Sequence, residues 1–476
     1  MRIILNELKK IWDIKILAII AVLCVLYFLF SMSFFIATFP SNLPSAFSSA
    51  QFHEYARYLT ERYGATLEQD EFEEFILYRS GIIAEINQFI QANPVLAAMG
   101  IFNYEDYEIF AANEADTMGN GTGESQPQRF YSERRVPGED YAEGGGQFES
   151  ERQRFYSEET SSDDAVVRHE MEINEHSREG GESGRFGGQF ESRIEIIGGS
   201  EELNIVFNEL AGSPVFSELM SFDMLVNMYV NRDERIDSTI LMYAELIGTP
   251  VSERAVRRLN EIRESGEYMS IITQHTLNHT LGYGQRLGVL AVLAALILVS
   301  RLITTDRSNR VNWLQYTSRQ GRRILTKQFV AVILSAVGMT TLLVLIFAGI
   351  YSVNGTQVFW NNSINSFMGF PYHWLSITFG QYCLLIIGVI YVLSVGTAMC
   401  AFILSRFSRN LVMLIFKVIP FFIAVMLLSN WVLDHFLSVF DGGNDLTKLS
   451  ALAFALVVGV VTAAVIIHKE KRVELT

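Results

Sequence analysis

Residues 14–39 read IKILAIIAVLCVLYFLFSMSFFIATF and contain one charged side chain, Lys15. A helix needs about 20 apolar residues to cross the roughly 30 Å hydrocarbon core of a bilayer, so this run is long enough to span it. Five further runs have a similar character: 286–303, 329–353, 376–404, 411–432 and 449–467. The sequence therefore predicts an all-α integral membrane protein with six transmembrane helices, of which 286–303 is the shortest.

The composition agrees with this prediction, because half of the 476 residues are hydrophobic. Such a chain is too apolar for an ordinary soluble protein of several domains. The net charge of -15 is unevenly distributed: residues 40–284 hold 44 acidic residues, 18 arginines and no lysine, whereas the rest of the chain has a net charge of +11. We expect the two parts to face different compartments. The acidic surface argues against nucleic acid as a partner.

The orientation follows from the short loops, because Lys and Arg near span ends are retained in the cytoplasm. Basic residues gather in 2–15, 301–327, 406–409 and 469–472, which fall on one side if there are six spans. Both termini are therefore expected in the cytoplasm, with the chain in the plasma membrane. Residues 14–39 could instead be a signal peptide, since PSAFSSA at 44–50 offers small residues for cleavage. The run is longer than a typical signal-peptide core, which favours a retained span.

Residues 40–285 are predicted to form a mostly helical extracytoplasmic domain between spans one and two. Apolar residues recur at helical spacing between 71 and 91, namely Phe72, Phe75, Ile76, Ile82, Ile83, Ile86 and Phe89. Two further helix starts are indicated by Ser200, a plausible N-cap, and by Thr249 followed by Pro250. Ahead of span one, residues 1–13 read as an amphipathic cytoplasmic segment.

Residues 117–199 differ from the rest of the outer domain, because they hold 14 of the 34 glycines and few aliphatic side chains. Such a segment buries too little apolar surface to offset its chain entropy, so it is predicted to be disordered. RFYSE occurs at 129 and 154, and GGQFES at 145 and 187, at spacings too unequal for a solenoid. The repeats could bind a wall polymer weakly, but a linker without specific function is the simpler interpretation.

Motifs that carry chemistry are missing from the sequence. There is no G-x-x-x-x-G-K-[ST] loop, no H-E-x-x-H, no C-x-x-C and no G-x-S-x-G. His275 and His279 would share a helix face and could bind a metal, but no third ligand lies nearby, so a structural role is favoured. We therefore expect a chain that is not an enzyme and has no cofactor or metal of its own.

The spans hold no Asp or Glu, which argues against a transporter coupled to protons or sodium. Lys417 is the one charged residue well inside a span, and its amine can reach the cytoplasmic interface. If the protein moves a substrate, the energy is expected to come from another subunit.

The most basic connection is 304–328, TTDRSNRVNWLQYTSRQGRRILTKQ, which is longer than a tight turn requires. Aromatic and aliphatic residues stand among the positive charges of this connection. This pattern predicts a short amphipathic helix, a turn at Gly321 and a basic entry into the third span.

This stretch resembles the corresponding loop of type-2 ABC exporter permeases, in particular Gram-positive members with a large outer insertion between spans one and two. The likeness covers the membrane half of the chain, although the connection between spans five and six is short for the family. In that family the loop is a coupling helix that docks into a separate ATP-binding subunit. The resemblance implies that Asp306 opens the loop and that the docking helix and its base contain Trp313, Leu314, Tyr316, Arg319, Arg322, Arg323 and Lys327.

The resemblance thus implies a non-catalytic permease subunit of an ATP-driven exporter, which works as a dimer with two copies of an ATPase. An alternative is a surface protein that transports nothing and whose outer domain binds a phage, an envelope component or a secretion machine. A sensor that signals inward is a weaker alternative, because no predicted cytoplasmic segment is larger than a loop.

Deletion of residues 117–199 tests the predicted linker. The shortened chain should insert into the membrane and keep the protease resistance of its remaining outer helices, because a linker contributes nothing to a buried core. Limited proteolysis of the detergent-purified chain measures this, with deletion of the apolar helical segment 71–91 as the disruptive control. Equal damage from both deletions would contradict the prediction.

Overall fold

The structure is a computed structural model, and the residues that it describes are 2–40, 49–110, 205–206, 208–210, 213–247, 251–308, 321–369, 372–408, 411–434, 436–440 and 444–471. They belong to two compact units, one comprising 83–213 and the other the rest of the chain. The regular elements of the described residues are helices, as predicted.

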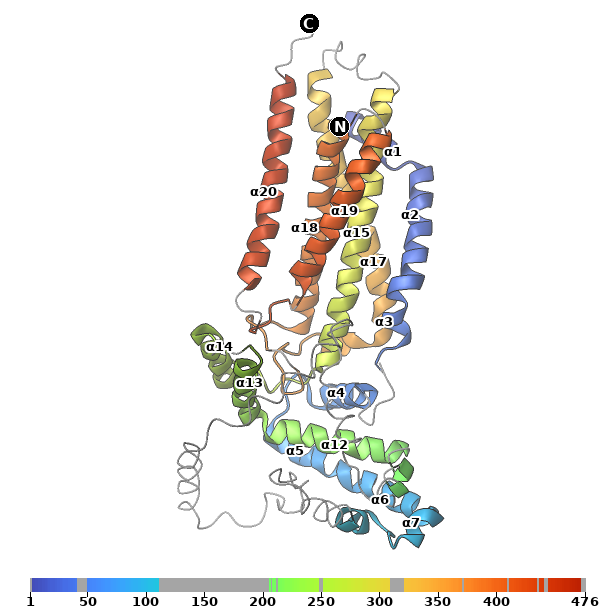
Figure 1. Ribbon diagram of the computed structural model, residues 1–476, viewed down its shortest axis with the longest axis vertical. Coiled ribbons are helices and arrows are strands. Elements are labelled where there is room, and N and C mark those ends of the chain that lie inside the picture. The colour runs from blue at the N-terminus through green and yellow to red at the C-terminus, as the bar shows by residue number, and fades with distance from the viewer. Residues whose placement is uncertain are drawn as a thin grey trace, which may run out of the picture. The chain divides into compact units, whose positions relative to one another are not determined.

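Long apolar helices run side by side in the larger unit (Figure 1). Their bounds are α2 Ile14–Tyr27, α15 Gln274–Ser308, α17 Gly321–Tyr351, α18 Phe379–Arg406, α19 Leu411–Leu433 and α20 Asn444–Lys471. Among the described residues five segments are long and apolar enough to cross a membrane: 14–32, 274–299, 324–354, 379–406 and 413–433. The predicted class, an all-α membrane protein with several spans, is therefore confirmed by the length and apolar character of these helices. The sixth expected span, 449–467, lies within the 28 residues of α20.

The first span is not a single regular helix, in contrast to the prediction for 14–39. α2 is followed by a π-helical segment, η1 (Phe28–Met32), and by the short helix α3 (Phe34–Ala37). At the junction the Ser33 amide donates to the carbonyl of Phe28 at 2.7 Å, five residues back. The Ser33 hydroxyl donates to the carbonyl of Leu29 at 2.7 Å. A serine hydroxyl that bonds to the helix backbone in this way is a common cause of a bend.

The second span begins much earlier than predicted, because α15 starts at Gln274 rather than at 286. Its first turns are polar in sequence, and hydropathy alone therefore assigned them to the outer domain. In the structure these side chains are buried and bonded: Thr276 is 0 % exposed, and the Thr280 hydroxyl lies 2.9 Å from the Tyr351 hydroxyl of α17. Burial is acceptable for polar groups that have such partners.

α15 is the central helix of the bundle, and it packs against α2, α17, α18 and α19. Its contact with α18 is close at Gly284, where an added Cβ would lie 2.6 Å from Cγ2 of Ile386. A side chain at this position would therefore push the two helices apart. α2 and α19, by contrast, leave most of their apolar surface uncovered by the chain, as expected for helices in contact with lipid.

The predicted connection 304–328 is shorter in the structure than in the sequence analysis. α15 continues through Asp306 to Ser308, and Gly321 is the first residue of α17 instead of a turn. Helical structure therefore extends into the connection from both sides. The expected docking helix falls at 309–320, outside the described residues.

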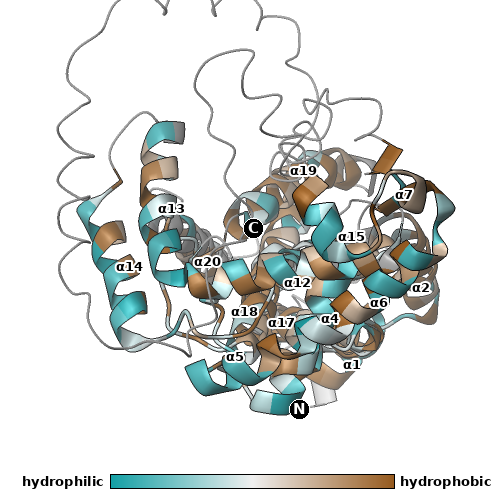
Figure 2. Cartoon of the chain, turned by 90° about the horizontal axis from the view of Figure 1, so that it is seen from below, coloured by the Kyte–Doolittle hydropathy of each residue, from teal (hydrophilic) through white to brown (hydrophobic). Residues whose placement is uncertain are grey.

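Within the part of the chain that the structure describes, the larger unit also contains α1 Arg2–Ile11, α4 Ser49–Tyr63, α5 Gln69–Ile76, α12 Pro214–Val230, α13 Arg232–Ile247 and α14 Glu253–Ser265. α6 (Tyr78–Ala92) also begins there and continues into the smaller unit. The short 3-10 segments η2 (Ser352–Asn354) and η3 (Thr356–Phe359) follow α17. Hydrophilic residues predominate on α14, whereas hydrophobic residues predominate on α19 (Figure 2).

The segments on either side of the glycine-rich insert pack together within the larger unit. Phe72 of α5 stacks on Tyr229 of α12 with 3.8 Å between ring centroids. Arg79 of α6 forms an ion pair with Asp223 of α12 at 2.7 Å. Helices from before and after 117–199 thus share one core, while the insert itself lies outside the described residues.

The helical face predicted for 71–91 is present. Phe72, Phe75, Ile82 and Ile86 are buried, whereas Ile76, Ile83 and Phe89 are partly buried. The start of the later helix was predicted too early, because the N-cap of α14 is Ser252 rather than Thr249. The Ser252 hydroxyl accepts from the amide of Ala255 at 3.3 Å, a usual N-cap contact. Ser200 lies outside the described residues.

The smaller unit contains the rest of α6 and the short helix α7 (Pro94–Ala98). α7 begins with Asn93 as N-cap and with proline at its first position, which is the favoured arrangement. The Asn93 side chain also donates to Glu209 at 2.9 Å, and Asn87 accepts from the amide of Tyr104 at 2.7 Å. The contact between Asn93 and Glu209 joins a residue that precedes the insert to one that follows it.

Acidification should weaken the packing of α4 against α15, because it protonates the buried His53 side chain. This side chain is 6 % exposed, and its Nδ1 lies 3.3 Å from the Thr276 hydroxyl. Burial, together with the charges of His275 and Arg57, lowers the pKa of His53 from 6.5 to about 4. Between these two values the unfolded chain binds more protons than the folded chain, so stability falls as the pH falls.

We expect a lower melting temperature at pH 5 than at pH 7, with a loss of about 2 kcal/mol from His53. His53→Gln should make the pH dependence of thermal unfolding shallower by that amount, because glutamine does not titrate. His468→Gln is the matched control, since His468 lies exposed on α20. A pH dependence that is the same in all three proteins would contradict the assignment.

Candidate functional site: the helix ends around residues 304–328

The residues proposed for the coupling loop fall into three groups in the structure. Trp313, Leu314, Tyr316 and Arg319 lie outside the described residues. Asp306 is in the last turn of α15, and Arg322 and Arg323 are in the first turn of α17, where the backbone alone is described. Lys327 is a partly buried residue of α17. The described members of this set thus lie at the ends of two neighbouring helices.

α1 packs against α17 near the start of that helix. It is amphipathic, with Glu7 and Ile11 buried on one side and Lys9 and Lys10 exposed. The burial of Ile11 at 1 % exposure fits an ordinary amphipathic helix. The burial of a glutamate at 5 % exposure does not, and it requires specific partners.

The carboxylate of Glu7 has two donors. Nε2 of Gln328, a buried residue of α17, donates to Oε2 at 3.2 Å, and Nζ of Lys10 donates to Oε1 at 3.0 Å. The ion pair offsets the cost of burying the charge, and the amide contact ties α1 to α17. Gln328 directly follows Lys327, the last residue of the proposed coupling site.

A second contact joins the end of α1 to α17 further along the helix. Nε1 of Trp12 donates to the hydroxyl of Ser335 at 3.2 Å. The same indole ring packs close to Gly338, where an added Cβ would lie 3.3 Å from Cζ2 of Trp12. α1 is therefore fixed to α17 from Gln328 to Gly338.

This helix contact was not predicted from the sequence. Residues 1–13 read as amphipathic, but no role followed for Glu7, Trp12, Gln328 or Ser335. One signal was present, namely a single glutamate in an otherwise basic segment, RIILNELKKI. Its partner, 321 residues away along the chain, could not have been found in that way.

Lys417 behaves as its position in the sequence suggested. Its Nζ donates to the carbonyl of Phe407, the C-cap residue of α18, at 3.0 Å. The amine thus lies at the helix end, where unpaired backbone carbonyls attract positive charge. This contact supports a structural role for Lys417.

A second polar cluster lies among the connections between the outer helices and the bundle, centred on Arg258 of α14. Its Nη2 donates to Glu267 at 2.9 Å and to Ser376 at 3.1 Å, and Nε donates to the carbonyl of His373 at 3.3 Å. Asn365 also donates to Glu267, at 2.8 Å. Burial alone would raise the pKa of Glu267, but these hydrogen bonds and the charge of Arg258 hold it below its usual value.

The Arg258 cluster orders the connection between α17 and α18, and backbone contacts extend that order to the connection between α19 and α20. The amide of Trp374 donates to the carbonyl of Leu437 at 2.9 Å, and the amide of Val439 to the carbonyl of Tyr372 at 2.8 Å. Because its contacts join the connections to α14, we interpret the cluster as structural.

The two histidines considered for a metal are joined by a third, His53, around the ring of Phe39. Ring centroids are 4.7 Å apart for Phe39 and His53 and 4.8 Å apart for Phe39 and His279. Phe39 therefore lies where a shared ligand would have to be. Among the described residues no group of three or more His, Cys, Asp or Glu side chains has a geometry suited to a metal ion.

Comparisons with protein-family models, with curated proteins and with solved structures found no match to this chain. The likeness to exporter permeases therefore rests on residues 304–329 and on the order of the predicted spans.

The contact between α1 and α17 predicts an effect of Glu7→Ala. This change leaves the buried amide of Gln328 without its acceptor, and about 1–3 kcal/mol of stability should be lost. Lys9→Ala is the control, because Lys9 is exposed on the same helix. Thermal unfolding in detergent measures both variants. A Glu7→Ala protein as stable as the Lys9→Ala protein would contradict the contact.

Proposed function

We propose that the chain is the membrane-spanning permease subunit of an ATP-driven exporter. The proposal is carried by one observation: the helices that flank the basic connection 309–320 are α15, the central helix of the bundle, and α17, its neighbour. A force applied to this connection would act directly on the most enclosed of the five described candidate spans. A surface loop retained only by its charge would not need such a placement.

The energy source is proposed to be a separate subunit with an ATP-binding cassette, because the sequence has no phosphate-binding loop of its own. That subunit would bind the segment with Trp313, Leu314 and Tyr316, and the basic residues from Arg319 to Lys327 would flank the contact. Hydrolysis in the partner would displace the segment, and rigid helices would carry the displacement into the bundle.

The orientation follows the charge distribution, with 309–320 and both termini in the cytoplasm of a bacterium and 40–273 outside its plasma membrane. Six spans are proposed, with α20 as the last. Figure 1 shows four features at the same end of the bundle: α1, the C-terminal end of α20, the C-terminal end of α15 and the N-terminal end of α17. This arrangement agrees with an even number of spans. Two copies of the chain would form the transport path between them.

The competing proposal is a surface protein whose outer domain binds an external ligand. A groove between α4, α5 and α12 favours the surface protein, because transport does not require such a groove. The two proposals differ in what should copurify with the chain.

The deciding experiment is a pull-down of the tagged chain from its native host in mild detergent, followed by mass spectrometry. An ATP-binding subunit should copurify in stoichiometric amount. Trp313→Ala or Arg322→Glu should abolish its recovery without changing membrane insertion. Lys471→Glu is the charge-matched control, since it lies on α20 rather than beside the connection.

Normal recovery of the ATPase with both loop variants would exclude the proposed docking segment. Recovery of envelope or secretion components without any ATPase would favour the surface protein.

A further inference from the structure

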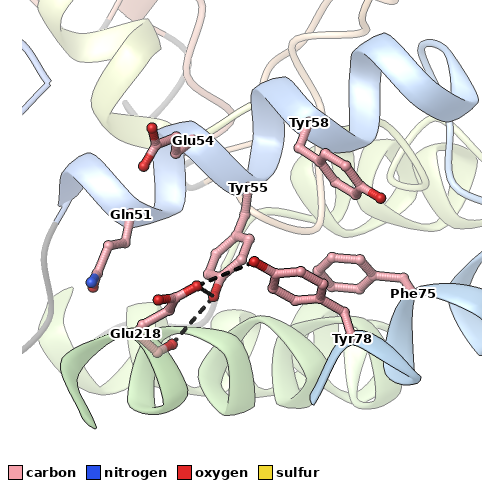
Figure 3. Close-up of a pocket in the computed structure, with 7 residues that line it drawn as sticks. All are labelled: Gln51, Glu54, Tyr55, Tyr58, Phe75, Tyr78 and Glu218. Atoms are coloured by element: carbon pink, nitrogen blue, oxygen red, sulfur yellow. Dashed lines mark hydrogen bonds between the residues drawn. The ribbon is translucent and has the colours of Figure 1, made fainter. Parts of the chain in front are cut away.

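A groove in the outer part of the larger unit has no role in the proposed transport. It lies between α4, α5, the start of α6 and α12, and its volume is about 260 Å³ (Figure 3). Six side chains define its chemistry: Glu54, Tyr55, Tyr58, Phe75, Tyr78 and Glu218. Gln51 lines it as well, but its Oε1 already accepts from the hydroxyls of Ser217 and Ser221 at 3.1 and 2.9 Å.

The aromatic rings form a corner with two orientations. Phe75 and Tyr78 are nearly parallel, at 7°, and Tyr58 is tilted from Tyr78 by 30°. The ring of Tyr55 stands almost perpendicular to both Phe75 and Tyr78, at 81°. Ring faces therefore border the groove in two directions.

The corner is open to solvent. Tyr58 is 43 % exposed and Tyr78 is 49 % exposed. Side chains of this size left exposed around a groove are typical of binding surfaces.

The charge of the groove is negative. The hydroxyls of Tyr55 and Tyr78 converge on the carboxylate of Glu218, with distances of 3.4 and 3.5 Å, as Figure 3 shows. Burial and the nearby charge of Glu218 raise the pKa of Tyr55, so its hydroxyl stays protonated. Within the described part of the chain neither Glu54 nor Glu218 has an ion-pair partner.

The nearby arginines are engaged elsewhere. Arg57 forms an ion pair with Glu61 at 2.8 Å, and Arg79 pairs with Asp223 through two contacts at 2.7 and 3.0 Å. These ion pairs are thus with carboxylates outside the groove, although the charge of Arg57 also acts on Glu54. A cationic ligand would find the carboxylate of Glu218 beside the rings.

We propose that this groove binds an organic ammonium cation, whose charged head contacts the faces of the Tyr58, Tyr78 and Tyr55 rings and the carboxylate of Glu218, while Glu54 adds negative charge to the lining. Aromatic faces attract ammonium groups through their quadrupole, and the attraction is strongest for alkylated ammonium ions, which shed water easily. The two carboxylates add a Coulomb attraction that a neutral ligand lacks.

A neutral sugar fits the groove less well. Sugars also stack on aromatic rings, but their hydroxyls need donors as well as acceptors around them. Here the carboxylates supply acceptors only, and the phenol protons of Tyr55 and Tyr78 are directed at Glu218. The proposal is independent of the exporter function, since it concerns the outer helices alone.

Choline tests the site, with 3,3-dimethylbutan-1-ol as its uncharged counterpart of the same shape. We expect isothermal titration of the full-length chain in detergent to show saturable binding of choline. The alcohol should bind about tenfold more weakly, because it lacks the charge. Glu218→Gln and Tyr78→Leu should each weaken choline binding by a similar factor. Glu234→Gln is the control, since Glu234 is exposed on α13 and does not line the groove. This variant should bind choline as tightly as the unmodified chain does.

Three results would overturn the proposal. Equal affinities for choline and the alcohol would show that the groove is simply apolar. Choline binding that survives both Glu218→Gln and Glu54→Gln, in variants whose melting temperature is unchanged, would place the cation elsewhere. Saturable binding of N-acetylglucosamine without any binding of choline would identify a carbohydrate site instead.

Discussion

The polar first turns of α15 are the constraint on which the rest of the bundle depends. Thr276, His279 and Thr280 are buried there, away from water, and each must find a partner within the protein. Thr276 meets His53 of α4, while Thr280 and His279 meet Tyr351 of α17. These contacts determine where α17 ends and where α4 lies. The apolar remainder of α15 then fills the space between α2, α17, α18 and α19, where packing is less directional.

Hydropathy predicted most of the fold, because the cost of burying charge in a bilayer acts on each segment separately. It failed at the helix ends, where the decisive contacts join distant segments. The start of α15 reads as polar, and only its contacts with α4 and α17 reveal it as buried. Gly321 reads as a turn, yet it begins α17. Ser252 was passed over for Thr249 because proline at 250 resembled a stronger helix start.

Of the candidate sites, the sequence predicted the basic connection but neither the contact of Glu7 nor the groove. Composition identified the basic connection at 304–328, since charge near a span end is a local property. The contact of Glu7 with Gln328 was not predictable, because the two residues are 321 positions apart and neither belongs to a recognisable motif. The groove around Tyr55 was also missed. Tyr55 and Tyr78 look like ordinary residues of helical faces, and Glu218 joins them only because the helices before and after residues 117–199 pack together.

Polar contacts are unevenly placed along α15 and α17, and their placement bears on the proposed coupling. At one end of the pair, Tyr351 bonds to Thr280, and the Tyr283 hydroxyl donates to the carbonyl of Phe347 at 2.8 Å. At the other end, the described contacts of α17 include those with Glu7 and Trp12 at the N-terminus of the chain. In the proposed exporter, a displacement applied at 309–320 would move these residues together with the start of α17, while the contacts of Tyr351 and Tyr283 would hold the opposite end of the pair. The shift would then change the packing around α15.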